Sequence, residues 1–549
     1  MSARASILRV AAGFAAGAIV VGVWGARASL PACRGECNPS GCAAPPCCSG
    51  DVNGDAMIDI ADAVCLLSYL FGNAKACAVA ELAAPSCDPC PPPAACPPGT
   101  LPLDGAYVWL PGLPEDNAAP FLDELAGLNI RLVLTQYARE PSADLPDSFV
   151  WSRGCPGIIG TVLDAAQARG IAVYVGLTYG GFGFYLEPRA SAIIADIDAT
   201  AAELAGRYGS NPAFAGWYVT DEPELAAARD PSVYFAYYAR AMRAIRAHSG
   251  KPIVVSPYLK GAGTKTPEEI GRRSRDFLAA TGVDILNWQD SVGAGDINIG
   301  WPGRGTAPTS GDYFRAIAAA VGRDRAWADI ELFTTSLRGY TGGGYQPTCM
   351  ARLGRQIALA GDCVGRRTTW INQRHMSAAA ADAFPGADRL LAAYGAWYAD
   401  AGRFIAPASY EWKTAPDPRY GDCGNEPFNR ASGDPKSYLD AEWTGVCGDL
   451  VIEVDFGSPR AVDFVACELL HLEWMNIRYP AAMEVSFSAD KSAWSAPRVT
   501  ELGFAGENGE YVLANRAPLG AEGRYLRLAL RNAGWTFLSE IEIVAAPAR

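Results

Sequence analysis

The chain has 549 residues, of which 50% are hydrophobic, and its formal net charge is −13. At roughly 150 residues per domain, this length predicts three or four domains. The negative charge argues against nucleic acid and anionic membranes as partners, because both attract surfaces rich in Lys and Arg. The three histidines, His248, His375 and His471, are far apart in the chain, which disfavours a histidine-ligated metal or a Ser-His-Asp site.

Residues 1–28 are typical of a secretory signal peptide. Arg4 and Arg9 precede an apolar run over residues 10–24, and Ala26-Arg27-Ala28 supplies a cleavage site with small residues. The apolar run is shorter than the ~20 residues that a membrane-spanning helix needs. We therefore expect a protein that is secreted or held at the cell surface, with no membrane segment after cleavage. An uncleaved anchor is the alternative.

Cysteine is concentrated near the N-terminus. Residues 29–83 form a Cys-rich module, and residues 84–102 form a stiff linker in which proline is abundant. In an oxidising compartment, this density of cysteine indicates disulfides. Zinc at Cys87 and Cys90 is the alternative, but no second Cys-x-x-Cys pair and no histidine lies at a suitable spacing.

Residues 51–62 have the spacing of a calcium-binding loop. Side-chain oxygens occupy positions 1, 3, 5, 9 and 12 of the loop, and a backbone carbonyl occupies position 7. The ligands are Asp51, Asn53, Asp55, Met57, Asp59 and Asp62. With the helical run over 61–71, the loop resembles one half of a dockerin. The resemblance implies a structural calcium ion and a cohesin-like protein partner. Ala56 stands where glycine is usual, and a degenerate loop that binds calcium weakly is the alternative.

Residues 103–402 alternate short β-type runs with helical runs. The predicted strands are 106–110, 131–137, 172–177, 215–220, 253–258, 285–289, 325–330 and 368–372. The predicted helices lie near 117–127, 156–169, 190–208, 231–248, 267–280, 310–321, 349–360 and 386–400. Eight such pairs predict a closed (β/α)8 barrel. An open doubly wound sheet is the alternative, but its usual glycine-rich first turn is absent from the sequence.

Two carboxylates follow the fourth and seventh of these strands. Glu222 comes directly before Pro223, which ends the fourth strand, and Glu331 closes the seventh. In a barrel, these strand ends form the active-site face. A pair of carboxylates at such a place can cleave a glycosidic bond, one as nucleophile and the other as acid and then base. Helix capping or pairing with arginine are the alternative roles.

The placement resembles that of the clan-A glycoside hydrolases, whose acid/base follows strand four and whose nucleophile follows strand seven. The segment from Gly216 to Glu222 is also similar to strand four of uncharacterised glycosidase-like barrels in bacterial secreted proteins. The resemblance covers roughly residues 103–400. It implies retaining hydrolysis with Glu222 as the acid/base and Glu331 as the nucleophile, and no catalytic cofactor.

Further polar and aromatic side chains lie at the same strand ends, as is typical of saccharide sites. Asp221 stands where the better known clan-A enzymes have an asparagine that bonds the sugar 2-hydroxyl, so Asp221 or Glu224 could replace Glu222 as the acid. The predicted substrate contacts are Trp109, Gln136, Tyr137, Tyr179, Asp221, Glu224, Tyr258, Trp288, Gln289, Asp290, Trp370 and Asn372.

Residues 403–549 lose the helical period and show alternating β-type runs at 450–456, 483–488 and 525–530. The run over 524–528, followed by Trp535 to Ile543, resembles the end of a discoidin-like domain (coagulation factor five/eight type C). This resemblance implies a galactose-binding-like β-sandwich that binds glycans. A domain that only steadies the barrel is the alternative.

Together these features predict a secreted glycoside hydrolase that acts on a poly- or oligosaccharide with retention of configuration. The alternative function is a non-catalytic carbohydrate-binding or cell-surface scaffold built on a glycosidase-like barrel.

Overall fold

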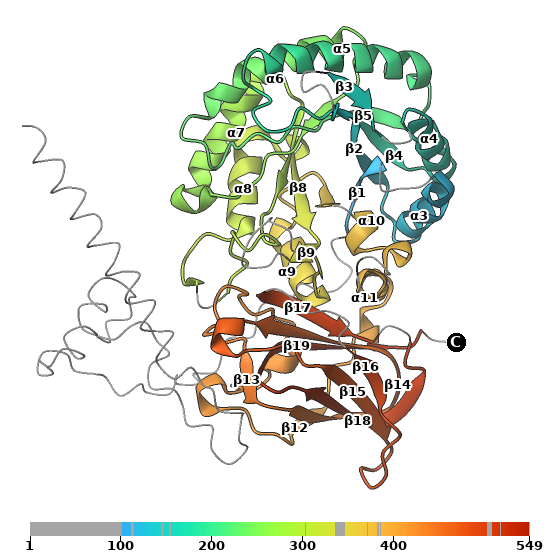
Figure 1. Ribbon diagram of the computed structural model, residues 1–549, viewed down its shortest axis with the longest axis vertical. Coiled ribbons are helices and arrows are strands. Elements are labelled where there is room, and N and C mark those ends of the chain that lie inside the picture. The colour runs from blue at the N-terminus through green and yellow to red at the C-terminus, as the bar shows by residue number, and fades with distance from the viewer. Residues whose placement is uncertain are drawn as a thin grey trace, which may run out of the picture.

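A computed structural model describes residues 102–547, except 111–114, 144–147, 153–154, 302–303, 335–345, 371, 382–383, 385, 502–507 and 516–517. Figure 1 shows two bodies stacked along the long axis of the molecule, a barrel ringed by helices and a β-domain. The predicted signal peptide, the calcium loop over 51–62 and nearly all of the linker lie outside the described residues. Within the described residues, no helix is long and apolar enough to cross a bilayer.

Eight parallel strands form the barrel. They are β1 (Gly105–Val108), β2 (Leu132–Pro141), β4 (Ala172–Thr178), β5 (Phe214–Val219), β6 (Ile253–Val255), β7 (Ile285–Gln289), β8 (Ala326–Glu331) and β11 (Arg367–Trp370). The sheet closes because β1 pairs with both β2 and β11, so that Gly105 lies opposite Leu132 on one side and Thr368 on the other. A closed barrel is thereby confirmed, and the open doubly wound sheet is excluded. A short strand, β3 (Phe149–Trp151), pairs antiparallel with the end of β2.

The helices follow the predicted runs closely and surround the strands (Figure 1). They are α3 (Glu115–Gly127), α4 (Gly157–Arg169), α5 (Arg189–Tyr208), α6 (Phe235–Arg246), α7 (Pro267–Thr281), α8 (Ser310–Val321), α9 (Met350–Ala360), the short α10 (Asn372–His375) and α11 (Ala387–Ala399). Their starts have local causes. Thr266 caps α7 by accepting from the Glu269 amide, and Thr309 and Asp312 form a reciprocal capping box on α8.

Alternate strand residues face the barrel interior and the surrounding helices. The interior layer contains Tyr107, Leu132, Leu134, Tyr174, Tyr218, Val254, Ile285 and Trp327. On β8, Asp329 and Glu331 lie two and four residues beyond Trp327 and so share its inward face. Trp288 has the opposite orientation: it is fully buried in the core between the strands and the helices. Its burial does not support the predicted substrate contact, which stays a prediction.

A polar layer crosses the middle of the barrel. The Asn287 amide donates to Tyr107 Oη at 2.9 Å and to Thr368 Oγ1 at 2.8 Å, and Tyr107 shares a short hydrogen bond with Ser256. Thr368 in turn donates to Asp329 Oδ1 at 3.3 Å. These bonds satisfy most of the buried polar groups beneath the carboxyl ends of the strands. The layer therefore forms a fixed polar floor for the site above it.

The β-domain is an antiparallel sheet of eight strands with a core of its own. Its strands are β12 (Ser409–Trp412), β13 (Thr444–Cys447), β14 (Leu450–His471), β15 (Ala482–Ser488), β16 (Arg498–Glu501), β17 (Gly509–Ala514), β18 (Ala521–Arg531) and β19 (Trp535–Ala545). The three predicted runs lie on β14, β15 and β18. In the core, Ile452 lies opposite Leu528, and Val454 lies opposite Leu526. A separate β-domain is confirmed; its discoidin-like character stays a prediction.

Buried ion pairs join the two bodies. Arg352 of α9 donates to Glu510 of β17 at 2.8 Å, and neither side chain is exposed. Arg389 of α11 lies 3.4 Å from Glu542 of β19. A two-stranded hairpin between β8 and α9, made of β9 (Phe333–Thr334) and β10 (Gln346–Pro347), also contacts β17. The segment that carries Glu331 thus continues directly into the domain interface.

Candidate active site

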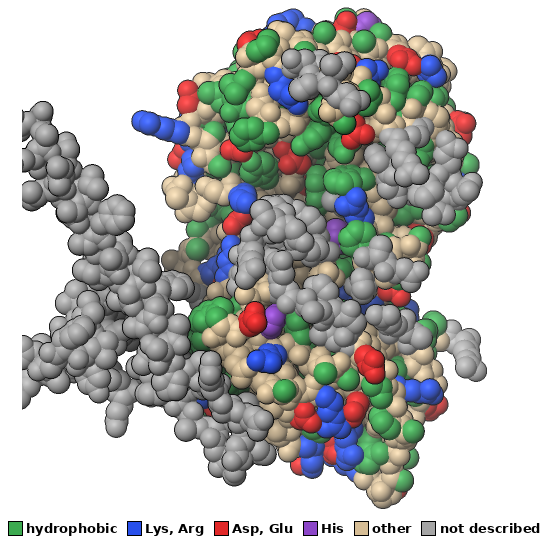
Figure 2. All heavy atoms as spheres, in the orientation of Figure 1, with side chains coloured by type: hydrophobic (Ala, Val, Ile, Leu, Met, Phe, Trp, Pro, Cys, Tyr) green, Lys and Arg blue, Asp and Glu red, His purple; other side chains and the backbone are tan. Residues whose placement is uncertain are grey.

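The two predicted catalytic acids lie at the carboxyl ends of the barrel. Glu222 follows β5, the fourth strand of the barrel, and Glu331 is the last residue of β8, the seventh. Glu331 is in register with Trp370 on the neighbouring β11. Because all eight strands are parallel, these ends meet on one face. On the face that Figure 2 views, acidic side chains lie among hydrophobic ones over the barrel half.

Glu222 is half-buried, and its surroundings favour the protonated form. Burial raises the pKa of its carboxyl group from 4.5 to about 7, and the charge of Asp221 acts in the same direction. The Gln289 amide at the end of β7 faces Glu222 and opposes this rise. A carboxyl group with a pKa near 7 can donate a proton at neutral pH and accept one afterwards.

Glu331 is more enclosed than Glu222, with an exposed fraction of 2%. Its Oε2 accepts a hydrogen bond from the Ala294 amide at 2.8 Å. The neighbouring Gly293 packs so closely that a Cβ there would lie 2.9 Å from the Glu331 Cβ. Burial raises the pKa of Glu331 well above its ordinary value and the charge of Asp290 adds to this, whereas the Ala294 bond and the charge of Arg352 lower it.

Asp290 orients Glu331 and does not face a substrate. Its Oδ1 accepts from the Glu331 amide at 3.3 Å, and its Oδ2 accepts from Gln356 of α9 at 2.7 Å. Asp290 is 1% exposed, and burial raises the pKa of its carboxyl group to about 6. The predicted sugar contact is therefore corrected to a positioning role.

Asp329 links the two acids, and sequence reasoning missed it. It lies on the inward face of β8 below Glu331 and is fully buried. Burial raises the pKa of its carboxyl group far above the ordinary value, and the charges of Asp290, Glu331 and Glu222 raise it further. Asp329 thus lies within electrostatic reach of both Glu222 and Glu331. The signal was available in the sequence, because Asp329 precedes Glu331 by two residues on one strand.

Aromatic rings line the same strand ends. Tyr137 of β2 stacks on Tyr179, which follows β4, with ring centroids 5.1 Å apart, and Trp109 lies 6.4 Å from Tyr137. Tyr179 is 39% exposed. Tyr258 faces Glu224. Burial raises the pKa of the Tyr258 hydroxyl group, and the Glu224 carboxylate raises it further. These five side chains of the predicted set lie where a sugar could contact them. The other accessible members are Glu222 and Trp370.

Asp221 lies under this surface and is 1% exposed. Its Oδ1 accepts from the Gly180 amide at 2.8 Å, and its Oδ2 accepts from the Tyr237 hydroxyl at 2.6 Å. Both oxygens thus hold protein groups in place of the sugar hydroxyl that was expected. Asn372 is also fully buried, and its amide donates to Thr369 at 3.1 Å. Neither side chain is accessible in this structure, and Asn372 Oδ1 is buried without a hydrogen-bond partner. Both sugar contacts stay predictions.

Gln136 and Gln289 lie at the edge of the site, with exposed fractions of 4% and 6%. Gln136 Nε2 is buried without a hydrogen-bond partner. An unsatisfied buried amide is costly unless a ligand or water completes it. The Gln289 amide interacts instead with Glu222. Both substrate contacts stay predictions.

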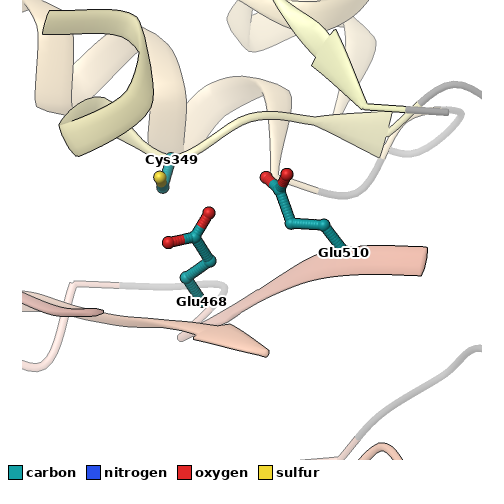
Figure 3. Close-up of side chains that lie close together, drawn as sticks. All are labelled: Cys349, Glu468 and Glu510. Carbon is teal, nitrogen blue, oxygen red and sulfur yellow. The ribbon is translucent and has the colours of Figure 1, made fainter. Parts of the chain in front are cut away.

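Among the described residues, one group has ligand atoms close enough to hold a metal ion. Figure 3 shows Cys349, Glu468 and Glu510 converging at the domain interface, with one ligand atom of each within 4.8 Å of the others. Protein donors already serve the carboxylates. Ser432 donates to Glu468 at 2.5 Å, Ser539 makes a short bond to its other oxygen, and Arg352 pairs with Glu510. The group is accounted for as a polar contact between the two domains.

The closed parallel sheet with its surrounding helices is a TIM barrel. A family model described as a domain of unknown function (DUF4434) matches residues 113–377. No curated protein matches the chain in sequence.

Solved structures similar to the chain are glycoside hydrolases. A Bacteroides thetaiotaomicron protein provisionally named an alpha-L-fucosidase aligns at 16% identity and a TM-score of 0.42, over 55% of this chain and 95% of its own. A family 5 glycoside hydrolase from Bacteroides vulgatus aligns at 13% identity and a TM-score of 0.35, over 78% and 89%. An exo-beta-1,4-mannosidase from an Opitutaceae bacterium aligns at 15% identity and a TM-score of 0.33, over 49% and 51%. Such low scores say nothing about activity, which depends on the site itself.

Proposed function

We propose that this protein is a glycoside hydrolase that cleaves a glycosidic bond in an oligo- or polysaccharide with retention of configuration. One observation carries the proposal. Glu222 follows the fourth strand of a closed parallel barrel and Glu331 ends the seventh, so both carboxyl groups lie on the face formed by the carboxyl ends of the strands. Retaining hydrolysis requires two carboxyl groups on one face of the barrel, one as the nucleophile and one as the acid/base.

In the proposed reaction, Glu222 gives its proton to the oxygen of the scissile bond while Glu331 attacks the anomeric carbon. The aglycone leaves and a glycosyl ester forms on Glu331. Glu222, now ionised, takes a proton from water, which hydrolyses the ester and restores both acids. The Ala294 amide and the charge of Arg352 favour the ionised form of Glu331 that attack requires, against the larger effect of burial, which favours the neutral form. The accessible aromatic rings at the strand ends would contact the sugar.

A second candidate is a carbohydrate-binding protein without catalysis. The burial of Glu331 favours it, because this residue is 2% exposed and burial favours its neutral form. A neutral, covered carboxyl group is a poor nucleophile. In this case the chain binds glycans at the barrel and releases no product.

Hydrolysis of a panel of polysaccharides and aryl glycosides separates the two candidates. We expect the wild-type chain to release product, and we expect Glu222→Gln and Glu331→Gln each to lose at least about 100-fold in kcat/KM. Glu268→Gln, on the exposed start of α7, is the matched control and should keep full activity. Glycan binding with no product from the wild-type chain would support the second candidate. Unchanged hydrolysis in both active-site variants would refute the assignment of the acids.

The N-terminal and C-terminal predictions extend this proposal. We propose export by the signal peptide over 1–28, a structural calcium ion in the loop over 51–62, and a glycan-binding, discoidin-like role for the domain over 403–549. A cohesin-like partner would dock on the calcium module. Calorimetric titration of the full chain with calcium tests the loop, and Asp51→Ala with Asp55→Ala should abolish the binding heat. An undiminished heat in this double variant would remove the predicted loop from consideration.

A further inference from the structure

The loop between β4 and α5 carries apolar side chains into solvent beside the proposed active site. Phe182 is fully exposed, Leu186 is 55% exposed and Tyr179 is 39% exposed. Large apolar side chains that gather on one exposed loop often mark a place where something binds. This loop leaves the carboxyl end of a barrel strand, which is the face that holds Glu222.

The tip of the loop has a defined shape. Gly181 and Gly183, on either side of Phe182, have φ angles of +72° and +73°. Residues other than glycine seldom adopt this left-handed conformation, so two glycines here specify a tight turn that presents the residue between them. The sequence Gly180-Gly181-Phe182-Gly183 thus encodes an aromatic ring at the apex of a turn.

The base of the same loop is firmly anchored. The Gly180 amide donates to Asp221 at 2.8 Å, and Arg189 donates to the Gly180 carbonyl at 2.8 Å. Phe184 is only 7% exposed, and its ring lies 4.9 Å from that of Tyr237. Because Asp221 directly precedes Glu222, the loop is tied to the peptide that carries the proposed acid/base. This explains what Asp221 does in place of binding a sugar.

Phe182 follows a stacked pair of aromatic rings along the chain. A Cβ on Gly181 would lie 3.8 Å from Cε1 of Tyr179, so the backbone next to Phe182 packs against the Tyr179 ring. Tyr179 stacks in turn on Tyr137. Phe182 itself is fully exposed, three residues beyond Tyr179 on the same loop.

We propose that Phe182 is a platform for a sugar ring beyond the one that is cleaved, so that the substrate is an oligosaccharide or polysaccharide chain. The inference rests on the proposed function and adds a place on the protein where a second sugar ring of the substrate binds. The C–H face of a pyranose is apolar and packs on aromatic rings, while its hydroxyl groups stay hydrated. A chain that reacts near Glu222 and extends past Tyr179 would place a further ring on Phe182. A small glycoside bound at the acids would be too short to reach Phe182.

Binding measurements in the Glu222→Gln variant test the platform, because they do not require cleavage. The probes are gluco-, xylo-, manno- and galacto-oligosaccharides of one to five residues, titrated calorimetrically. Relative to Glu222→Gln alone, adding Phe182→Ala should weaken binding of the longer oligosaccharides about five- to tenfold and leave the monosaccharide unchanged. Adding Phe182→Trp should restore it. Adding Val499→Ala, at an exposed apolar position on β16 of the β-domain, is the control and should change neither.

Each contrary outcome has a defined meaning. Equal weakening at all lengths would show that the loop had collapsed, and no weakening at any length would show that the ring is not used; both overturn the platform. Loss of self-association with unchanged sugar affinity would assign Phe182 to a protein contact and also overturn it. A wild-type chain that binds none of the oligosaccharides overturns it as well. If binding depends on oligosaccharide length as predicted but the wild-type chain hydrolyses none of the oligosaccharides, the proposed reaction is overturned and the platform is not.

Discussion

The ion pair between Arg352 and Glu510 offers a sharp test of how the two domains are held together. Arg352 Nη1 lies 2.8 Å from Glu510 Oε2, and both side chains are fully buried. Arg352 Nη2 also makes a short bond to the carbonyl of Phe333, two residues after Glu331. The perturbation is a pair of single substitutions, Arg352→Met and Glu510→Gln, together with the double variant.

The size of the effect follows from burial. Removing one partner leaves an uncompensated charge away from water, which costs about 3–5 kcal/mol. In Arg352→Met, the Phe333 carbonyl loses a donor as well, so this variant should be the less stable of the two. When both charges are removed, no buried charge is left, and the loss should fall below about 2 kcal/mol. The pair should therefore show a coupling free energy of several kcal/mol.

Urea denaturation of the full chain, followed by tryptophan fluorescence, measures these free energies. Lys413→Met, at an exposed pair with Glu411, is the matched control and should lie within about 0.5 kcal/mol of the wild type. Additive losses in the double variant would refute the reasoning, because they would mean that the two charges do not depend on each other. Single losses as small as that of the control would refute it too.

Three further predictions concern the site and the barrel. If Glu222 is the proton donor, kcat/KM should fall as pH rises through the Glu222 pKa of about 7. The residual activity of Glu222→Gln should not show this fall. If the variant keeps the same pH profile, the group that titrates is not Glu222. Tyr237→Phe removes a hydrogen bond that favours ionised Asp221 and helps to hold the pKa of its carboxyl group down to about 6. The cost, about 2 kcal/mol, should therefore be larger at pH 8, where Asp221 is ionised, than at pH 5. Equal costs at the two pH values in urea denaturation would count against that bond. Gly176→Ala should lower the melting temperature, because the new Cβ would lie 2.3 Å from backbone oxygens of β2. Gly206→Ala, on α5 with nothing within 4 Å of the new Cβ, should raise the melting temperature slightly. The opposite order of the two melting temperatures would contradict the packing.

The barrel could be predicted from the sequence because its signals are local. The run predicted as a strand over 215–220 forms β5 over Phe214–Val219, and the helix predicted near 310–321 forms α8 over Ser310–Val321. Apolar runs, caps and breakers act within a few residues, so each element could be located on its own. The count of eight strand-helix pairs then specified closure.

The site was predicted less completely. The burial and the hydrogen-bond partners of a strand-end side chain depend on residues far away in the sequence. The period of two along β7 already implies that Trp288 and Gln289 point in opposite directions, and applying it would have removed Trp288 from the candidates. No local pattern indicates that Tyr237 and Gly180 occupy the carboxylate of Asp221. The cover over Glu331 comes from Gly293 and Ala294, almost forty positions earlier in the chain, and only the folded backbone brings them there.

The interface between barrel and β-domain has a consequence for how the protein can be dissected. Arg352 and Arg389 project from the barrel toward carboxylates that only the β-domain supplies. Beside them, Cys349 packs against Ala466 and Val512 of that domain. A gene fragment that stops near residue 402 would encode a barrel in which both guanidinium groups lack their carboxylate partners and an apolar surface is uncovered. The barrel and the β-domain therefore form one structural unit, and both should be kept when the protein is expressed, screened or engineered.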